Sequence, residues 1–382
     1  MYNVCIIGGG PTGLTTAKLL AEQGWECVVL EEHTKIGEPT ECTGLISASG
    51  VKELGLDLSE CLVNTIYGAD IYSPGNYMLS VQRETPVAYL IDRADFDKKL
   101  AKEAHAAGVE IKNNSRMINI NNNSVFFQAK ERGELIKAQV IVGADGALSK
   151  TREMKFGGKP KQNSFIHAYQ VRGQGNFNEK KVNVYLGNYA KGFFAWNSPE
   201  NKSVSRIGLG TNLGEKIKEN FDLFAKEKNF AEETFNSRIS SLIPVGPPLE
   251  KAVKENILLV GDAAFQTKST SGGGIMLGLE AAKACAKTID NHFKHKKPLE
   301  NYNKEIEPIK KELRMHWKIR NYLNSLNEAQ TDKLFIKLKN AGIEEFLNEE
   351  GHMDKPAQFI SKLALKPKMW GMFGTGLKFL MS

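Results

Sequence analysis

Two short apolar runs frame the beginning of the chain and predict two buried strands. They cover residues 4–7 and 27–30. Between them, apolar residues from Leu14 to Ala21 recur at the spacing of one broad helix face. The pattern therefore predicts a strand, a glycine-rich turn at residues 8–13, a helix and a second strand, in that order.

The pattern further along the chain predicts a mixture of strands and helices. Strands are expected at 66–73, 77–81, 87–91, 109–111, 116–120, 125–128, 135–138 and 140–142, four times between 164 and 211, and at 257–260. Helices are expected over 93–107, 214–228 and 275–292, and from about residue 298 onwards. Asp92 is expected to cap the first of these helices and Gly108 to end it. Residues 33–50 are rich in glycine, and we expect an ordered loop there.

The glycine-rich turn carries a pattern that is typical of dinucleotide binding. Gly8 allows a tight turn, Gly10 lets the backbone approach a pyrophosphate, and Gly13 lets the helix pack closely on the strand. The N-terminus of the helix, near Thr12, then offers free N–H groups to the phosphates. Glu31 ends the second strand, where its carboxylate can accept hydrogen bonds from ribose hydroxyls. The alternative is a glycine turn that only packs the strand against the helix.

Together these patterns predict a mixed α/β (α+β) fold. A Rossmann-like nucleotide-binding domain is expected to be discontinuous, over residues 1–65, 92–160 and 250–297. An inserted antiparallel-sheet domain for the substrate is expected over 66–91 and 161–249, and a helical region over 298–382.

Composition excludes some classes of protein and leaves others open. The chain has 382 residues and a net charge of +7, without the interleaved basic and aromatic residues of RNA-binding modules, so we expect no nucleic-acid partner. Its five cysteines show no CxxC spacing, so neither a metal site nor a disulfide framework is indicated. The glycine turn lies too close to the first residue to leave room for a signal peptide, and no apolar run is long enough to span a bilayer. We therefore expect a cytoplasmic protein that is soluble or peripheral at the inner face of the membrane.

Three separated motifs resemble those of the FAD-dependent oxidoreductases with the para-hydroxybenzoate hydroxylase fold. They are GGGPTG at 8–13, GADGALSKTR at 143–152 and GDAAFQTKSTSGGGI at 261–275. Further segments resemble the geranylgeranyl reductase family, notably the archaeal digeranylgeranylglycerophospholipid reductases: IGEPTECTG at 36–44, DRADFD at 92–97 and YLGNYAKGFFAWNSP at 185–199. The chain departs from that family's YxWxFP-like signature at Phe194 and Ser198, and it has Ser269 in place of a proline before the glycine triplet.

The resemblance implies a set of residues that contact FAD. This set comprises Gly8, Gly10, Thr12, Gly13, Glu31, Cys42, Thr43, Leu45, Arg93, Met117, Asp262, Gly272, Gly273, Gly274 and Ile275. Several of these residues have a structural alternative: a helix cap for Asp262, a surface ion pair with Asp95 or Asp97 for Arg93, and a core position for Met117. Asp145 and Gly146 either support the pyrophosphate region or only form a turn.

The resemblance also implies a substrate cavity beside the flavin. Phe193, Phe194 and Trp196 are expected to line a tunnel for a long lipid chain, the alternative being a core between sheet and helices. Cys42 is the candidate catalytic residue, although a buried cysteine is more often an apolar filler. His167 and Tyr169 are further candidate proton donors.

The function implied is an FAD-dependent reductase that saturates carbon–carbon double bonds of a geranylgeranyl or polyprenyl lipid, either an archaeal membrane lipid or a quinone side chain. Two alternatives stay open: an FAD-dependent monooxygenase of an aromatic or isoprenoid substrate, and a non-enzymatic flavoprotein or lipid-binding module. The electron donor is left open between NAD(P)H, ferredoxin and a reduced deazaflavin. The C-terminal segment 356–382 mixes lysines with apolar and aromatic residues, which favours peripheral membrane contact. Its alternative is packing over the cavity or against another subunit.

Overall fold

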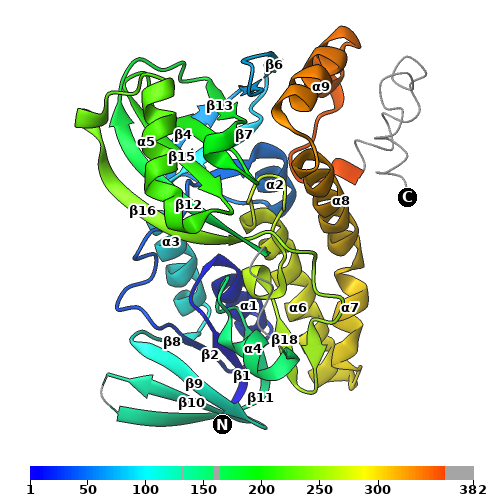
Figure 1. Cartoon of the computed structure of the whole chain (residues 1–382). Coiled ribbons are helices and arrows are strands. Elements are labelled where there is room, and N and C mark those ends of the chain that lie inside the picture. The colour runs from blue at the N-terminus through cyan, green and yellow to red at the C-terminus, as the bar shows by residue number, and fades with distance from the viewer. Residues whose placement is uncertain (131, 158–163, 358–382) are drawn as a thin grey trace.

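The described residues form three sheets, and helices pack against the two large ones (Figure 1). This computed structural model describes residues 1–130, 132–157 and 164–357. The predicted mixed α/β class is confirmed, because a parallel sheet, a separate and largely antiparallel sheet and C-terminal helices are all present. The division into domains drawn from the sequence stays a prediction.

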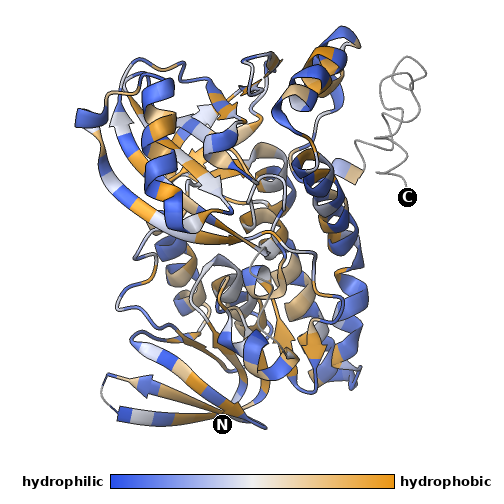
Figure 2. Cartoon of the chain, viewed as in Figure 1, coloured by the Kyte–Doolittle hydropathy of each residue, from blue (hydrophilic) through white to orange (hydrophobic). Residues whose placement is uncertain are grey.

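The first sheet contains the parallel strands on either side of the glycine turn. Its order is β17-β18-β11-β1-β2-β8, with β9 and β10 extending the outer part of β11 as an antiparallel arm. The strands are β1 (Tyr2–Ile7), β2 (Cys27–Leu30), β8 (Glu110–Lys112), β9 (Ser115–Asn121), β10 (Ser124–Ala129), β11 (Arg132–Gly143), β17 (Val253–Lys254) and β18 (Ile257–Leu259). β1 pairs in parallel with both β2 and β11, and burial on both faces explains its continuous apolar run. Figure 2 shows hydrophobic residues on β18, in contrast to the hydrophilic residues along much of α8 (Glu307–Asn324).

The strands predicted separately at 135–138 and 140–142 are one strand, β11. Its first half pairs with β10 and its second half pairs with β1, so the chain passes from the arm into the parallel sheet without a break. The apolar pattern changes from alternating to continuous at this point because one half is buried on one face and the other half on both.

Helices α1 (Pro11–Ala21), α3 (Arg93–Ala106) and α6 (Ile275–His295) share a core with the first sheet. The expected cap of α3 is confirmed, because the Asp92 carboxylate accepts a hydrogen bond from the Asp95 N–H at 3.0 Å. Gly108 follows this helix with a φ of 97°, a left-handed conformation that ends the helical path.

The second sheet has seven strands in the order β16-β12-β15-β14-β13-β5-β6. They are β5 (Gly68–Tyr72), β6 (Met78–Gln82), β12 (Phe165–Gln174), β13 (Lys181–Tyr185), β14 (Ala195–Pro199), β15 (Val204–Thr211) and β16 (Asn236–Pro244). All pairs are antiparallel except β5 with β13. Helix α5 (Ile217–Glu227) packs Phe221 and Phe224 against one face. β16 was not predicted, because much of its sequence is polar and exposed at the sheet edge.

A third, three-stranded sheet, β3-β7-β4, contradicts part of the loop expected at 33–50. Its strands are β3 (Leu45–Ser47), β4 (Leu62–Ile66) and β7 (Ala88–Ile91). Helix α2 (Ala48–Leu54) then begins inside the expected loop, because the Ser47 hydroxyl accepts a hydrogen bond from the Gly50 N–H at 3.1 Å. The glycine within this helix is explained by packing, since a Cβ on Gly50 would lie 2.7 Å from Met276 Cγ.

The C-terminal helices connect the two large sheets. After α4 (Lys150–Phe156) near the first sheet, the later helices are α7 (Tyr302–Glu305), α8, α9 (Glu328–Asn340) and α10 (Ile343–Glu350). Phe335, Ile343 and Phe346 from α9 and α10 pack against Leu79 of β6. No helix in the described part of the chain is long and apolar enough to cross a membrane. Residues 358–382, most of the segment expected to contact a membrane, lie outside the described residues.

Candidate functional site

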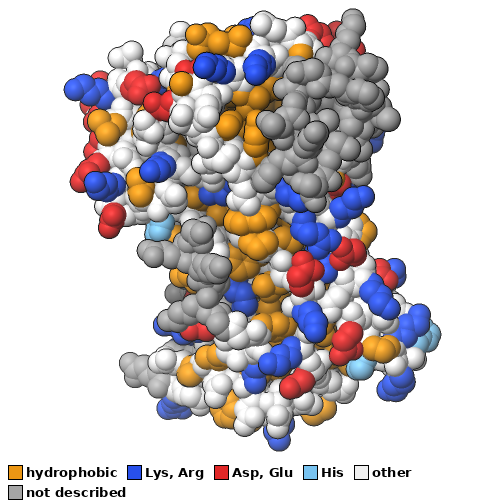
Figure 3. All heavy atoms as spheres, turned by 45° about the vertical axis from the view of Figure 1, so that its right-hand side comes forward, with side chains coloured by type: hydrophobic (Ala, Val, Ile, Leu, Met, Phe, Trp, Pro, Cys, Tyr) orange, Lys and Arg blue, Asp and Glu red, His pale blue; other side chains and the backbone are white. Residues whose placement is uncertain are grey.

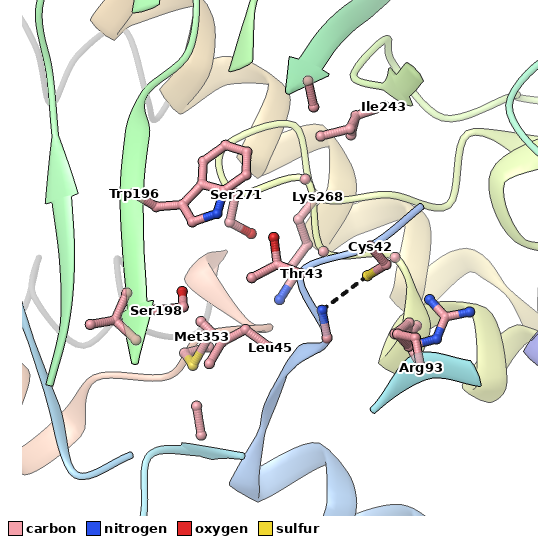
Figure 4. Close-up of a pocket in the computed structure, with 18 of the residues that line it drawn as sticks. Cys42, Thr43, Leu45, Arg93, Trp196, Ser198, Ile243, Lys268, Ser271 and Met353 are labelled. Atoms are coloured by element: carbon pink, nitrogen blue, oxygen red, sulfur yellow. Dashed lines mark hydrogen bonds between the residues drawn. The ribbon is translucent and has the colours of Figure 1, made fainter. Parts of the chain in front are cut away.

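A cavity of about 760 Å³ is lined by strand residues of the second and third sheets and by loops that follow strands of the first sheet. One part of its wall is formed by Gly10, Thr12 and the loop residues 37–45. The adjoining part is formed by residues 260–262 and 271–275, since a Cβ on Gly261 would lie 2.9 Å from Thr12 Oγ1, and the second sheet closes the far part (Figure 4). The three separated motifs of the sequence therefore meet in one place, together with the predicted aromatic segment.

The glycine turn is shaped by close backbone packing. Gly8 has a φ of +108°, and a Cβ there would overlap the Ala144 carbonyl. A Cβ on Gly13 would overlap the Gly8 carbonyl oxygen. Gly10 differs, because a Cβ there would meet no atom within 4 Å. The turn thus needs Gly8 and Gly13 for its own packing, while Gly10 leaves the backbone open towards the cavity.

Glu31 stabilises the glycine turn through hydrogen bonds of its carboxylate. Its carboxylate accepts hydrogen bonds from the Gly9 N–H at 2.7 Å and from the His33 N–H at 2.9 Å. The His33 ring contacts the same carboxylate at 2.7 Å. Glu31 is buried and does not line the cavity. Its predicted contact with ribose hydroxyls therefore stays a prediction beside an observed structural role.

The first turn of α1 offers unused donors to the cavity. Gly10 is the N-cap residue of this helix and supplies no side-chain cap. The N–H groups of the first turn therefore lack intrahelical partners, which is the arrangement that binds phosphate at helix N-termini. Gly146 and Ala147 line the same part of the cavity. The Asp145 carboxylate bonds Ser149 and Thr151 at the start of α4, so its observed role is structural.

Asp262 and the glycine triplet form a second polar part of the cavity wall, beside the first turn of α1. We call these two parts together the cradle. Asp262 Oδ1 accepts a hydrogen bond from the Thr267 hydroxyl at 2.7 Å, and the described residues give Oδ2 no partner. Burial raises the pKa of Asp262. A Cβ on Gly274 would lie 2.7 Å from Asp262 Oδ1, so glycine is needed for this approach. Ile275 then begins α6 without a side-chain cap, leaving a second set of open N–H groups.

These observations fit FAD. Two helix N-termini with open donors face one cavity, and a carboxylate oxygen without a protein partner lies between them. Gly10, Thr12, Asp262, Gly272, Gly273, Gly274 and Ile275 all line this part of the cavity, as do Cys42, Thr43, Leu45 and Arg93. Met117 does not line it, because its side chain is buried in the core beneath β9. The predicted backbone contact of Met117 stays a prediction.

The loop around Cys42 is fixed by side chains of the second sheet. Arg206 Nη1 donates to the Thr43 carbonyl at 2.6 Å and to the Ile91 carbonyl at 2.9 Å. The Gly44 N–H donates to Cys42 Sγ at 3.3 Å. Cys42 is half-buried and lines the cavity, whereas the other four cysteines are buried. Cys42 is therefore the one cysteine whose thiol can contact a ligand in the cavity.

Arg93 lies in the cavity wall and pairs with Asp97 across one helix turn, at 2.9 Å. Burial by itself lowers the pKa of Arg93, but the Asp97 carboxylate outweighs burial and holds this pKa above its usual value. The structure thus shows the ion pair that was the alternative for Arg93, although the pair is buried at the cavity rather than exposed on the surface.

The far part of the cavity is apolar and aromatic. The Phe193 and Phe194 rings stack at 4.2 Å between centroids, and Phe194 meets Trp196 edge-on at 5.9 Å. Trp196 Nε1 donates to Gln170 Oε1 at 3.1 Å, and Thr43 Oγ1 donates to the same oxygen at 2.7 Å. Further apolar side chains line the cavity, namely Ile66, Ile71, Val81, Val87, Val182, Val184, Ile239, Leu242, Ile243, Leu347 and Met353. The polar residues Arg83, Ser198, Ser241 and His352 line it as well.

Other candidates lie away from the cavity. Tyr169 packs edge-on against Phe221, at 4.9 Å between ring centroids, and His167 lies against Gly214. Neither lines the cavity, so the geometry gives no support to their proposed use as proton donors. No group of side chains among the described residues has the arrangement of a metal site.

Sequence reasoning missed four side chains of the site: Gln170, Arg206, Lys268 and Asp354. Gln170 and Arg206 lie on predicted strands. A polar residue on a strand does not indicate a site unless its distant hydrogen-bond partner is also known. Lys268 Nζ contacts Asp354 Oδ1 at 2.5 Å, and both side chains are buried. The available signal was Lys268 itself, a lysine enclosed between the GDAA and GGG motifs.

Comparison with known proteins agrees with this geometry. An uncharacterised protein of Methanocaldococcus jannaschii is 31% identical over 95% of this chain and 94% of its own length. The digeranylgeranylglycerophospholipid reductase of Methanothrix thermoacetophila is 25% identical over 96% and 97%, respectively. A solved geranylgeranyl bacteriochlorophyll reductase-like protein from Thermoplasma acidophilum superposes with a TM-score of 0.84 at 22% identity, covering 99% of both chains.

The predicted resemblance to digeranylgeranylglycerophospholipid reductases is thus confirmed by relatives that extend over nearly the whole chain. The matching family model, described as an FAD binding domain, covers residues 1–316, which include both helix N-termini, the Cys42 loop and the aromatic wall. The chain belongs to this family of FAD-binding proteins.

Proposed function

We propose that the protein is an FAD-dependent reductase that saturates carbon–carbon double bonds of a polyprenyl lipid. The observation that carries this proposal is the shape of the cavity. It continues from two open helix N-termini, past Cys42, into a chamber walled by Trp196, two phenylalanines and aliphatic side chains. A polar cofactor and an apolar chain can therefore lie end to end in one continuous cavity.

Gly10, Thr12, Asp262 and the Gly272–Ile275 segment would hold FAD, with Arg93 adding a cation on the side of α3. When bound and reduced, FAD supplies a hydride. The double bond also needs one proton, so each saturated bond gains two hydrogens and the cofactor loses two electrons. NAD(P)H, ferredoxin or a reduced deazaflavin would replace those electrons.

The chain's own residues would bind and orient the alkene. The stacked Phe193 and Phe194 rings and Trp196 give the chain an apolar surface and exclude water. Gln170 Oε1 accepts hydrogen bonds from both the Trp196 indole and the Thr43 hydroxyl. This shared acceptor keeps the aromatic wall at a constant distance from the Cys42 loop. Cys42 is the candidate group for the proton or for positioning the alkene, because its thiol lines the cavity between these two parts.

The substrate class follows from the relatives and from the surface. Several relatives are named as reductases of a digeranylgeranyl phospholipid, so a geranylgeranyl membrane lipid is the first candidate and a quinone side chain the second. Figure 3 shows apolar side chains reaching the surface in a band between the upper and lower parts of the molecule. Such a surface suits peripheral contact with the inner face of a membrane, from which a lipid tail would enter.

Anaerobic turnover tests the proposal. The FAD-loaded protein is reduced with dithionite and mixed with a geranylgeranyl lipid, and a fully saturated lipid serves as the control. We expect the absorbance of oxidised flavin to return only with the unsaturated lipid. Mass spectrometry should then show a product that is heavier by two hydrogens for each bond reduced. An unchanged lipid and a flavin that stays reduced would contradict the proposal.

The same FAD-loaded protein can be used to distinguish the proposed reductase from the alternative, an FAD-dependent monooxygenase. A monooxygenase consumes oxygen with NAD(P)H and adds an oxygen atom to its substrate. Oxygen uptake that is coupled to a hydroxylated or epoxidised lipid would replace the reductase assignment. A purified protein that takes up no FAD would instead favour the non-enzymatic lipid-binding module.

A further inference from the structure

A buried ion pair lies beside the glycine triplet and is not used in the function proposed above. Lys268 is 5% exposed and Asp354 is 2% exposed, with 2.5 Å between Nζ and Oδ1. The two residues come from distant parts of the chain, the loop before α6 and the segment after α10. Burying two charges is costly, so a pair at this position calls for a reason beyond packing.

The ammonium group lies directly over the middle glycine of the triplet. The Lys268 N–H donates to the Gly273 carbonyl at 3.1 Å, and the Lys268 carbonyl accepts from the Gly272 N–H at 2.8 Å. A Cβ on Gly273 would lie 2.7 Å from Lys268 Cε and 3.0 Å from Nζ. The side chain therefore folds back over its own loop instead of extending away from it.

The same side chain forms part of the cavity wall. Lys268, Gly272, Gly273 and Gly274 all line the cavity. Figure 4 shows Lys268 pointing from the loop that carries Ser271 towards the side where Thr43 and Leu45 lie. The resemblance implies that the glycine triplet and the start of α6 bring backbone N–H groups to the carbonyl edge of the flavin ring. The Lys268 ammonium group would therefore lie beside the same ring.

The surroundings leave the positive end of the pair towards the cavity. Asp354 also accepts a hydrogen bond from the Ser47 hydroxyl, and its backbone N–H donates to His352 Nδ1. The carboxylate of Asp354 is thus held by two side chains, Lys268 and Ser47, and Asp354 itself does not line the cavity. Arg320 contacts the Ser269 carbonyl and lies over the Phe193 ring, but it does not line the cavity, whereas Arg93 lines it on the side of α3.

We propose that Lys268 stabilises the negative charge of the reduced flavin ring at the glycine triplet, and that Asp354 limits the size of this effect. A fixed cation near a site where charge develops favours the charged state, most strongly where water is excluded. The inference rests on the proposed function, because only a flavin that accepts and returns electrons gains from it. Its tests need no alkene, so the failure of either proposal can be recognised separately.

The first test compares Lys268→Met with Lys268→Arg in the FAD-loaded protein, using the flavin reduction potential measured by dye equilibration. We expect Lys268→Met to shift the balance from reduced towards oxidised flavin by about tenfold, which is ~30 mV for a two-electron couple. Lys268→Arg keeps the charge and should shift the balance by less than about threefold. The matched control is Lys310→Met, which removes a buried lysine that pairs with Glu307 outside the cavity wall and should leave the potential unchanged.

The second test removes the opposite charge with Asp354→Asn. We expect the balance to shift towards reduced flavin, because Lys268 then acts without a neutralising partner. A purely structural pair would give two variants with lower melting temperatures and no opposite shifts in potential. Unchanged potentials in Lys268→Met and Asp354→Asn, or shifts in the same direction, would overturn the proposal. If Lys268→Met takes up no FAD, the direction of the Asp354→Asn shift decides alone.

Discussion

The two ends of the cavity are shaped by different parts of the polypeptide. At the nucleotide end, the backbone sets the geometry: glycines at 8 and 13 pack against carbonyl groups, and the donors are N–H groups of helix ends. At the apolar end, side chains from the second sheet and the C-terminal helices set it. Backbone geometry depends on a short local motif, whereas a side-chain wall depends on residues brought together by the whole fold. The first end is therefore readable from one short motif, whereas most residues of the second end are brought together only by the fold.

The sharpest test of the backbone end contrasts two glycines of the same turn. Gly13→Ala forces a Cβ into the Gly8 carbonyl, so we expect the free energy of unfolding to fall by about 3 kcal/mol and FAD binding to be lost. Gly10→Ala meets no protein atom, and Gly10 already has a φ of −78° that alanine tolerates. This variant should fold normally and lose FAD affinity only. Urea unfolding of the apo-protein and FAD titration measure both effects, and equal stability losses would contradict the contrast.

A buried histidine tests how the C-terminal side of the cavity is held. His316 contacts Thr270 Oγ1 at 2.6 Å, and burial, helped by the Lys268 charge, lowers its pKa to about 3. The unfolded chain binds this proton near pH 6.5 and the folded chain does not, so stability falls as the pH drops below 6.5. We expect a loss of about 2 kcal/mol between pH 6.5 and pH 5 from this residue alone.

The variant His316→Gln isolates that contribution. It removes the titrating group while keeping a polar side chain beside Thr270, so its unfolding free energy should depend less on pH than that of the unmodified protein. Urea unfolding at the two pH values gives the difference. Identical pH dependence in both proteins would show that the C-terminal side is not held by a neutral His316.

The aromatic wall is tested by Trp196→Ala. This change removes a ring that is 7% exposed, together with its hydrogen bond to Gln170. We expect the KM for the proposed polyprenyl lipid substrate to rise about tenfold, which is about 1.4 kcal/mol, with the FAD content unchanged. Trp25→Ala is the control, because Trp25 packs against Phe293 away from the cavity. A loss of FAD in Trp196→Ala would contradict the proposal that the two ends of the cavity bind their ligands independently.

The smallest expected effect concerns the junction that places Arg93. Asp92→Ala removes the cap of α3 and should lower the free energy of unfolding by about 1 kcal/mol. Asp92→Asn keeps an oxygen acceptor and should retain most of the stability. Thermal melting compares them. A large loss of FAD in the alanine variant would show that the cap serves the cofactor site as well as the helix.

The same contrast explains what the sequence predicted. The strands around the glycine turn and the cap at Asp92 followed from local patterns, whereas the common site of the three motifs was implied by the family resemblance. The strand that combines 135–138 with 140–142 was divided in error, because a change of neighbours along one strand resembles a break between two.

Long-range polar partners had no local signal. Lys268 and Asp354 are 86 positions apart, and nothing in either segment indicates the other. Arg206 reaches across the fold to the carbonyl groups of Thr43 and Ile91, a bond that any sequence at those two positions would accept. Such contacts depend on backbone atoms or on one distant side chain, so single-sequence patterns do not contain them.

The central position of β1 has a consequence for how the protein is made on the ribosome. This strand is synthesised first, but its parallel neighbour β11 follows only at residues 132–143, and β18, which completes the core, at 257–259. At ordinary translation rates, roughly 10–45 s pass between the emergence of β2 and that of β18. The newborn chain must keep the buried, apolar part of β1 from aggregating during that interval. FAD can meet a complete cradle only after Ile275 has left the exit tunnel, which makes cofactor capture one of the last steps of synthesis.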